Sequence, residues 1–307
     1  MVRHVNVVPY RAMVLRVTGC KARGLPIASM AKPAFVVAVV MLLSVSSLQV
    51  FASTPVRPVG GRTQVSVPND PYGSSHTTLL RLPQGRILVS WSQRRPTLGE
   101  TLASGIWARV LDSDLGALGE QFLVNRDVPP DSGWLDVYPA AAHTQDGFVV
   151  TWQNNYRDGS YMGVFAQRFD ASARHVGTEF QGNTITYGHQ GAPSATGTVD
   201  GGFLVVWDNL DFNGGSSDIA LQRFDPAGLP VGPESIAPSS PAVPPILRLG
   251  CAVAGRDEHI AVAWGETNLE DVGGADSDDV YARVLAPQAT DAVRVNASTS
   301  GAQILGD

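Results

Sequence analysis

The sequence predicts an all-β protein of the β-propeller type, built from four-stranded antiparallel blades. One motif occurs four times: a short strand carries large apolar residues at alternate positions and ends in tryptophan, as in Ile87-Val89-Trp91, Phe148-Val150-Trp152, Phe203-Val205-Trp207 and Ile260-Val262-Trp264. The four tryptophans are 61, 55 and 57 residues apart. The alternation has the period of two that a β-strand imposes. Units of this length that contain several short strands are typical of propeller blades.

Each unit contains signals for four strands. A turn such as Asp146-Gly147 precedes the tryptophan strand, and such pairs accept the positive φ of a tight hairpin. Upstream of this turn lies a small apolar segment, such as 139–142, which we expect to form the innermost strand. The third strands are predicted at 106–111, 164–169, 219–224 and 280–285, and the fourth at 122–125, 180–183, 235–237 and 293–296. Asp112, Asp170 and Asp225 follow three of the third strands.

We expect the repeats to fill residues 54–307, in units of about 62–125, 126–183, 184–237 and 238–296 with a tail at 297–307. The segment 64–67 resembles one more copy of the fourth strand. The array therefore contains four blades with a redundant edge strand, four blades with an incomplete fifth, or an open stack that needs another copy. A single blade cannot bury both of its faces, so the tryptophan faces are expected to pack between blades. Loss of one tryptophan is then expected to cost about 3–5 kcal/mol.

Residues 1–53 lie outside the repeats and are expected to be an N-terminal extension with a secretory signal. They contain six basic residues and no acidic residue, and the apolar run 34–43 is followed by Val50-Phe51-Ala52. A basic start, an apolar run of this length and a small residue at the end are typical of a signal peptide cleaved after Ala52. The run is too short to be a transmembrane span. The sequence thus predicts a protein that is secreted, at the bacterial cell surface or in the periplasm.

The charge balance argues against nucleic acid as a partner. The whole chain has 22 basic and 28 acidic residues, and removal of the six basic residues of the signal leaves a net charge of about −12. All of the remaining basic residues are arginine, because the only lysines are Lys21 and Lys32. A surface without a basic stripe does not favour binding to phosphate backbones or anionic membranes. Cys251 is the only cysteine after cleavage, so no intrachain disulfide is expected.

The second and third units resemble a unit found in tandem in large secreted bacterial surface proteins of the RTX type and in cadherin-repeat-bearing proteins. The resemblance is carried by 146–152, 164–170 and 177–180, and it extends over about residues 62–307. It implies a propeller-like array, linked to calcium, with a scaffolding or adhesive role and no catalytic residues. The glycine-rich nonapeptides of the RTX tail are absent from this sequence.

Acidic and amide residues between the strands suggest a metal site. The loop 209–215 presents oxygen atoms at alternate positions before two glycines, a pattern that calcium loops use. A second loop, 268–279, has five carboxylates between Glu270 and Asp279, which would repel one another without a counter-ion. The candidate ligands are Asn209, Asp211, Asn213, Asp276 and Asp278. Calcium is the only cofactor that the sequence suggests, and the alternative is an ordinary Asn/Gly-rich loop.

Four carboxylates could serve a glycosidase, because a propeller can bring acids from separate blades to its axis. The candidates are Asp136, Glu179, Asp208 and Glu266. Asp208 follows Trp207 directly and Glu266 lies two residues after Trp264, so both stand where a strand runs into a loop. The alternative is that such acids lie near the axis by chance.

These observations lead to two expectations about function. The first is an exported, non-catalytic binding or scaffolding repeat protein with weak calcium binding and an unknown protein or carbohydrate ligand. The second is a carbohydrate-active enzyme, similar to a glycosidase, on the same scaffold. An apolar or acidic funnel with two carboxyl groups about 5–10 Å apart would favour the enzyme, and a flat, loop-covered face would favour the binding module.

Overall fold

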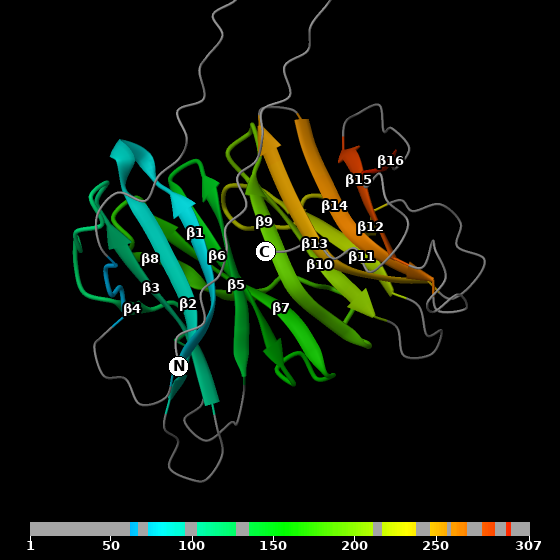
Figure 1. The fold of residues 1–307 in the computed structure, drawn as a ribbon, viewed down its shortest axis with the longest axis horizontal. Helices are drawn as coiled ribbons and strands as arrows, with labels where there is room; N and C mark the ends of the chain where they lie inside the picture. Colours follow the sequence, from blue (N-terminus) through cyan, green and yellow to red (C-terminus); the bar gives the residue numbers. More distant parts are fainter. Residues whose placement is uncertain are drawn as a thin grey trace, which may run out of the picture. The chain divides into compact units, whose positions relative to one another are not determined.

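The computed structural model describes residues 62–66, 73–95, 103–126, 135–210, 217–237, 246–256, 259–268, 278–285 and 293–295. All of these residues belong to the unit Gly60–Asp307, the C-terminal of the two units into which the chain divides. The predicted signal, residues 1–53, lies outside the described residues. Figure 1 shows that the fold is made of strands. The described part has no helix apart from a 3-10 turn at Pro83–Gly85, so the predicted all-β class is confirmed.

The strands form four units of four antiparallel strands, in chain order. The first unit has the order β1 (Ser74–Arg81), β2 (Ile87–Arg95), β3 (Ala103–Leu111) and β4 (Phe122–Leu123). The second contains β5 (Asp136–Thr144), β6 (Gly147–Asn155), β7 (Met162–Asp170) and β8 (His175–Gln181). The third contains β9 (His189–Gly197), β10 (Phe203–Leu210), β11 (Ser217–Phe224) and β12 (Ser235–Ile236). The fourth contains β13 (Ile246–Arg256), β14 (His259–Asn268), β15 (Asp278–Leu285) and β16 (Val293–Arg294).

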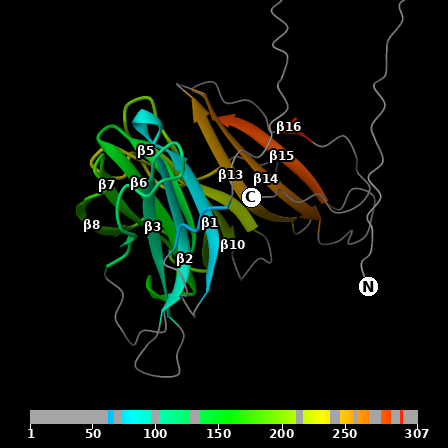
Figure 2. The same cartoon turned by 60° about the vertical axis from the view of Figure 1, so that its left-hand side comes forward.

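The innermost strand of each unit packs against that of the next. Contacts run from β1 to β5, from β5 to β9 and from β9 to β13, and Figure 2 shows the first unit in front of the second with the fourth farther along the array. The second and third units are also joined by a parallel bridge between Met162 and His189. Each unit is thus a local antiparallel sheet, and the units are held together mainly by side-chain packing.

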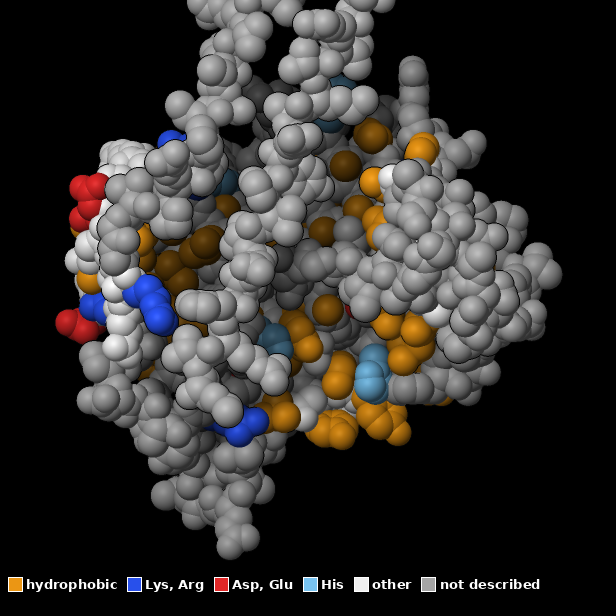
Figure 3. All heavy atoms as spheres, viewed as in Figure 1, with side chains coloured by type: hydrophobic (Ala, Val, Ile, Leu, Met, Phe, Trp, Pro, Cys, Tyr) orange, Lys and Arg blue, Asp and Glu red, His pale blue; other side chains and the backbone are white. Residues whose placement is uncertain are grey.

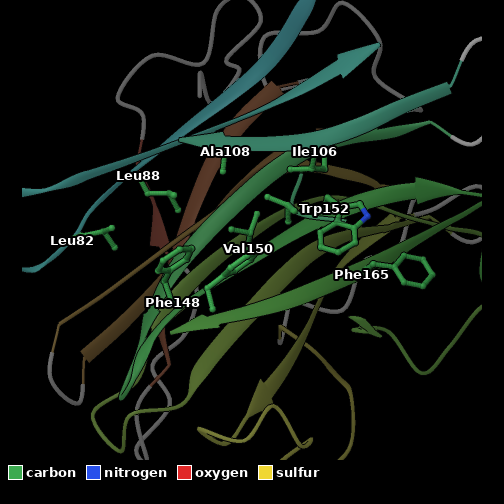
Figure 4. Close-up of a cluster of buried hydrophobic side chains, with 10 residues drawn as sticks. Leu82, Leu88, Ile106, Ala108, Phe148, Val150, Trp152 and Phe165 are labelled. Carbon is green, nitrogen blue, oxygen red and sulfur yellow. The ribbon is translucent and has the colours of Figure 1, made fainter. Parts of the chain in front are cut away.

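Side chains from alternate faces of neighbouring units form the core. Leu88 and Ile106 of the first unit pack against Phe148, Val150 and Trp152 of the second (Figure 4). The same arrangement recurs one unit later, where Trp207 packs over the second unit, and again where Trp264 packs over the third. Each tryptophan face therefore covers the second face of the preceding unit, as the period of two predicts.

The first unit differs, because the structure describes no unit before it. Its tryptophan face forms a separate cluster of Val89, Trp91 and Leu111, against which Val65 packs. The carbonyl oxygen of Val65 accepts a hydrogen bond from Nη1 of Arg109 (2.9 Å). The segment 62–65 has no strand assignment, so it is not the extra fourth strand that the sequence suggests, although it covers the expected face. Val67 lies outside the described residues.

The aspartates that follow the third strands close tight turns. Oδ1 of Asp112 accepts hydrogen bonds from the backbone N–H of Asp114 (2.9 Å) and of Gly116 (2.7 Å). Asp170 and Asp225 bond the backbone N–H four residues farther along in the same way, at 2.9 and 2.8 Å. Side-chain acceptors of this kind fix the turn into the fourth strand.

Candidate functional site

The innermost strands of all four units line one pocket of about 450 Å³. Each strand contributes the residues around a local irregularity in its pairing with the tryptophan strand. Figure 3 shows the side of the molecule on which these strands lie, where hydrophobic side chains and histidines gather between segments drawn in grey. We call this space the axial pocket, and it is lined by residues 76–79, 138–140, 192–194 and 250–252.

Each of the four strands places one residue in the left-handed region at the same position. These residues are His76 (φ 48°), Tyr138 (φ 53°), Ala192 (φ 45°) and Gly250 (φ 68°). Three of them are not glycine, and an L-residue pays a steric cost of about 1–2 kcal/mol in this conformation. Bulges and strained backbone of this kind concentrate beside functional sites, where they aim side chains and backbone groups.

Two of these strained residues form an aromatic pair on the wall of the axial pocket. The rings of His76 and Tyr138 have centroids 4.1 Å apart, and Tyr138 is 40% exposed. The Nδ1 atom of His76 lies 3.0 Å from Oγ of Ser75 and 3.3 Å from Oγ of Ser92. The pair offers a partly exposed aromatic surface, which can stack against the apolar face of a ligand ring.

Asp208 links the third unit to the fourth at the edge of this pocket. Its Oδ2 accepts a hydrogen bond from the backbone N–H of Gly250 (3.0 Å), and its Oδ1 accepts one from that of Cys251 (3.2 Å). Burial raises the pKa of Asp208, and the two backbone hydrogen bonds oppose this rise. A carboxyl group with a raised pKa can hold a proton and donate it, which is what a general acid requires.

Glu266 faces the same interface from the fourth unit. Its Oε2 accepts a hydrogen bond from Nε of Arg248 (3.0 Å), and Arg248 also pairs with Oδ1 of Asp218 through Nη1 (2.8 Å). Positions two residues apart in a strand share a face, and Val206 and Trp264, which precede these acids by two, belong to one buried cluster. Asp208 and Glu266 therefore point into the interface between the third and fourth units.

One short stretch of β13 anchors both acids. Arg248 holds Glu266, and Gly250, two residues later, holds Asp208. Two residues of a strand span about 7 Å. Two carboxylates from different units thus face one interface and bond the same strand, and hydrolysis of a glycosidic bond by an acid and a second carboxylate uses a pair of this kind.

The other two candidate acids have structural roles. Asp136 is fully buried, and its two oxygen atoms accept hydrogen bonds from Nδ2 of Asn125 (2.8 Å) and of Asn154 (2.6 Å). The side chain of Glu179 is 1% exposed and pairs with Nη1 of Arg157 (2.6 Å). Both acids thus satisfy buried donors, and neither is open to a ligand.

Of the predicted metal ligands, only Asn209 has a described side chain. Asp211, Asn213 and Asp276 lie outside the described residues, as does the side chain of Asp278. The Oδ1 atom of Asn209 accepts a hydrogen bond from Nε2 of Gln190 (3.2 Å). In the part of the chain that the structure describes, no three His, Cys, Asp or Glu residues are grouped so that they could hold a metal ion. Calcium at these loops stays a prediction from the sequence.

Sequence reasoning missed the residues that form the pocket itself. Tyr138 lies one residue before the predicted innermost segment 139–142, and nothing in the residue types of His76 and Tyr138 indicates a left-handed backbone. Arg248 was missed as well, although an arginine at the start of an otherwise apolar strand is a signal that it meets an acid there. The acids Asp208 and Glu266 were found because they follow the tryptophan motif.

No family model and no curated protein sequence matches the chain. Solved structures do resemble it. A protein of unknown function from Dyadobacter fermentans has a TM-score of 0.51 and 11% identity, with 74% of this chain and 70% of that chain covered. A GH43 endo-arabinanase from Bacillus licheniformis has a TM-score of 0.40 and 16% identity, with 69% and 73% covered. An α-L-arabinofuranosidase from Lactobacillus brevis has a TM-score of 0.45 and 11% identity, with 72% of each chain covered. Likeness at such identity concerns the fold alone.

These comparisons correct two expectations. The solved structures that are similar to this chain are glycoside hydrolases and a protein of unknown function. They are not repeat units of RTX-type or cadherin-bearing surface proteins, so the resemblance stated from the sequence is wrong. The non-catalytic binding or scaffolding role, with its description as a calcium-binding module, depended on the resemblance and is wrong with it. The described residues include no helix with the length and hydrophobicity needed to cross a membrane.

Proposed function

We propose that this protein is a carbohydrate-active enzyme of the glycoside hydrolase type, and that the sugar binds in the axial pocket. The observation that carries the proposal is the pair Asp208 and Glu266, which two units direct into one interface and which both bond β13. Asp208 bonds Gly250, a residue that lines the axial pocket, and Glu266 bonds Arg248, two residues earlier. The predicted export signal belongs to the same proposal, because a secreted enzyme would meet its saccharide outside the cytoplasm.

The two acids would divide the work. Asp208, whose pKa is raised by burial, would protonate the oxygen of the leaving group. Glu266 would act as the second carboxylate, either on a water molecule or on the sugar itself. Arg248 would hold Glu266 in place through its 3.0 Å hydrogen bond. The exposed rings of His76 and Tyr138 would support the apolar face of the sugar.

The test is hydrolysis of a panel of aryl glycosides and plant and bacterial polysaccharides by the wild-type chain and two variants. Asp208→Asn and Glu266→Gln keep the size of each side chain and remove its acid–base chemistry. Each variant is expected to lower kcat at least about a hundredfold, in the range typical of a lost general acid or base. The alkaline limb of the pH profile of kcat is expected to disappear in Asp208→Asn, because that limb reports loss of the acid's proton.

Asp146→Asn is the matched control, because Asp146 is an exposed carboxylate in the turn between β5 and β6. It should leave kcat unchanged. Absence of hydrolysis across the panel would contradict the proposal, and so would wild-type rates in both acid variants. Circular dichroism of the variants separates a lost fold from a lost catalytic group.

A further inference from the structure

A second cavity of about 500 Å³ lies between the outer strands of the first and second units. Its floor is apolar: Val110 on β3, Phe122 on β4 and Ala173 in the turn between β7 and β8 pack against the core beneath it. Two arginines, Arg126 and Arg174, line the same cavity. We call this cavity the outer groove. None of its lining residues belongs to the axial pocket.

The repeat explains why the outer groove is open. Arg168 occupies in the second unit the position that Val110 occupies in the first, since they pair with the equivalent residues Val149 and Leu88. Nη1 of Arg168 donates a hydrogen bond to the carbonyl oxygen of Pro226 in the next unit (3.0 Å). The arginine thereby covers the junction of the second and third units. Val110 is too short to do so.

The turn between β7 and β8, which lines the groove opposite Val110, also differs from its equivalent in the third unit. Ala171 is the equivalent of Pro226, and its carbonyl oxygen accepts a hydrogen bond from Nη1 of Arg86 (3.0 Å) instead. The side chain of Arg168 lies close to Gly228 in the turn of the third unit. A Cβ atom added to Gly228 would lie 2.9 Å from Nε of Arg168. The residue at this position in the first junction is Ala173, whose methyl group occupies that space.

The polar groups of the outer groove favour an anion. Arg126 and Arg174 are both exposed, and neither guanidinium has a hydrogen bond or ion pair among the described residues. His175 bonds the carbonyl oxygen of Val124 through Nε2 (3.0 Å), and its ring packs at a tilt of 54° against Phe169, with centroids 4.6 Å apart. A carbonyl can only accept, so Nε2 carries the proton and the ring stands as a fixed aromatic wall. Glu120 is the one acid among the described lining residues, which leaves a net charge of +1 in the outer groove.

We propose that the outer groove binds a small aromatic carboxylate, with its carboxylate between Arg126 and Arg174 and its ring over Val110 and Phe122. A guanidinium presents two parallel donors that match the two oxygens of a carboxylate. The apolar floor requires an apolar body, which inorganic anions lack. The net charge of +1 suits a monoanion better than a phosphate dianion. The groove is separate from the axial pocket, so this proposal stands or falls independently of the glycosidase.

Isothermal titration calorimetry of the whole chain with three probes tests the proposal. The probes are 1-naphthoate, its neutral analogue 1-naphthamide and inorganic phosphate. Naphthoate is expected to bind at least about tenfold more tightly than the amide, because the amide lacks the charge that strengthens a hydrogen bond to arginine. Equal affinity of naphthoate and the amide would overturn the role of the arginines. Phosphate that bound as tightly as naphthoate would overturn the role of the apolar floor.

Variants locate the probe. Arg126→Ala and Arg174→Ala are each expected to weaken naphthoate binding about tenfold, while Glu120→Gln strengthens it about twofold by removing a repulsion. The double variant Val110→Arg with Ala173→Gly rebuilds the covered junction of the next unit and is expected to abolish binding although it adds a positive charge. Arg81→Ala, an exposed arginine on β1, is the control and should bind as the wild type does.

Two results would place the probe outside the outer groove. One is wild-type affinity in the double variant, and the other is wild-type affinity in both arginine variants. If the double variant fails to fold, the two single arginine variants and the naphthoate–amide comparison still decide between binding in the groove and binding elsewhere.

Discussion

In the second and third units, the side chain that directly follows the tryptophan joins its unit to the next one. In the second unit this residue is Gln153, whose Oε1 accepts a hydrogen bond from the backbone N–H of Ala192 on the next innermost strand (3.0 Å). In the third unit it is Asp208, which accepts two such bonds from the bulge of β13. The same position thus does the same structural work with a neutral amide in one unit and an acid in the next.

The choice of an acid gives Asp208 a pH-dependent effect on stability. Burial raises its pKa above the ordinary value of about 3.9. The folded state therefore binds more protons than the unfolded state between about pH 3.9 and the raised pKa, and stability falls as the pH rises through this window. Above the window the cost of burying the charge is fully present.

Urea unfolding of the wild type and of Asp208→Asn between about pH 3.5 and 7 tests this sign. The free energy of unfolding of the wild type, relative to the variant, is expected to decrease as the pH rises. Asparagine does not titrate, so the variant provides the baseline. A difference that stayed constant, or grew with pH, would contradict the burial of an ionisable Asp208.

At the scale of the element, the innermost strands are shaped by backbone strain that residue types do not reveal. Glycine is free to adopt positive φ, so Gly250 fits its position, whereas Ala192 at the equivalent position carries a side chain at φ 45°. A Cβ added to Gly250 would meet nothing within 4 Å. Positions 192 and 250 therefore differ mainly in the conformational energy of the backbone, and less in how their side chains would pack.

Exchange of the two residue types should shift stability in opposite directions. Ala192→Gly is expected to raise the free energy of unfolding by up to about 1 kcal/mol, and Gly250→Ala to lower it by about 1 kcal/mol. Urea denaturation with unchanged m-values measures both effects. If Ala192→Gly instead lowers the free energy of unfolding by more than the loss of one buried methyl group accounts for, the backbone of Ala192 is not strained in the bulge.

The elements also show what the sequence can and cannot predict. The tryptophan strands and third strands lie where alternation and turn residues place them, because burial of one face imposes the period of two. The bulges could not be predicted, since they follow from how four strands meet and not from local propensity. The open groove beside Val110 is apparent only when its junction is compared with the one that Arg168 covers.

At the scale of the whole molecule, each unit touches its neighbours through a separate cluster. Trp152, Trp207 and Trp264 belong to three different clusters, and all three side chains are at most 1% exposed. Stability in such an array approximates a sum of units and nearest-neighbour interfaces. Changes in different interfaces should therefore combine differently from changes within one.

Double-mutant cycles test this expectation. Trp152→Phe and Trp264→Phe lie in the first and third interfaces and are expected to be additive within about 0.5 kcal/mol. Trp207→Phe and Val149→Ala share the second interface and are expected to couple by about 0.5 kcal/mol or more. Strong coupling between Trp152 and Trp264 would show that the array behaves as one undivided core.

The candidate site is formed by residues from several units, so the sequence could predict it only in part. Asp208 and Glu266 were recognisable as acids at strand ends, 58 positions apart in the chain. Their pairing depends on which face of each strand meets the neighbouring unit, and on the anchors in β13. Asp136 and Glu179 are also candidates from the sequence, although they do not follow the tryptophan motif, and in the structure they are enclosed by amides and by an arginine.

From the second unit onward, the tryptophan face covers the unit that comes before it in the chain, which gives the array a direction. A gene duplication that inserted one whole unit would add a tryptophan face, which packs on the unit before it, and a second face, on which the unit after it packs. The number of units could then change during evolution without redesign of any junction, and new chemistry could arise from a few residues at a single seam.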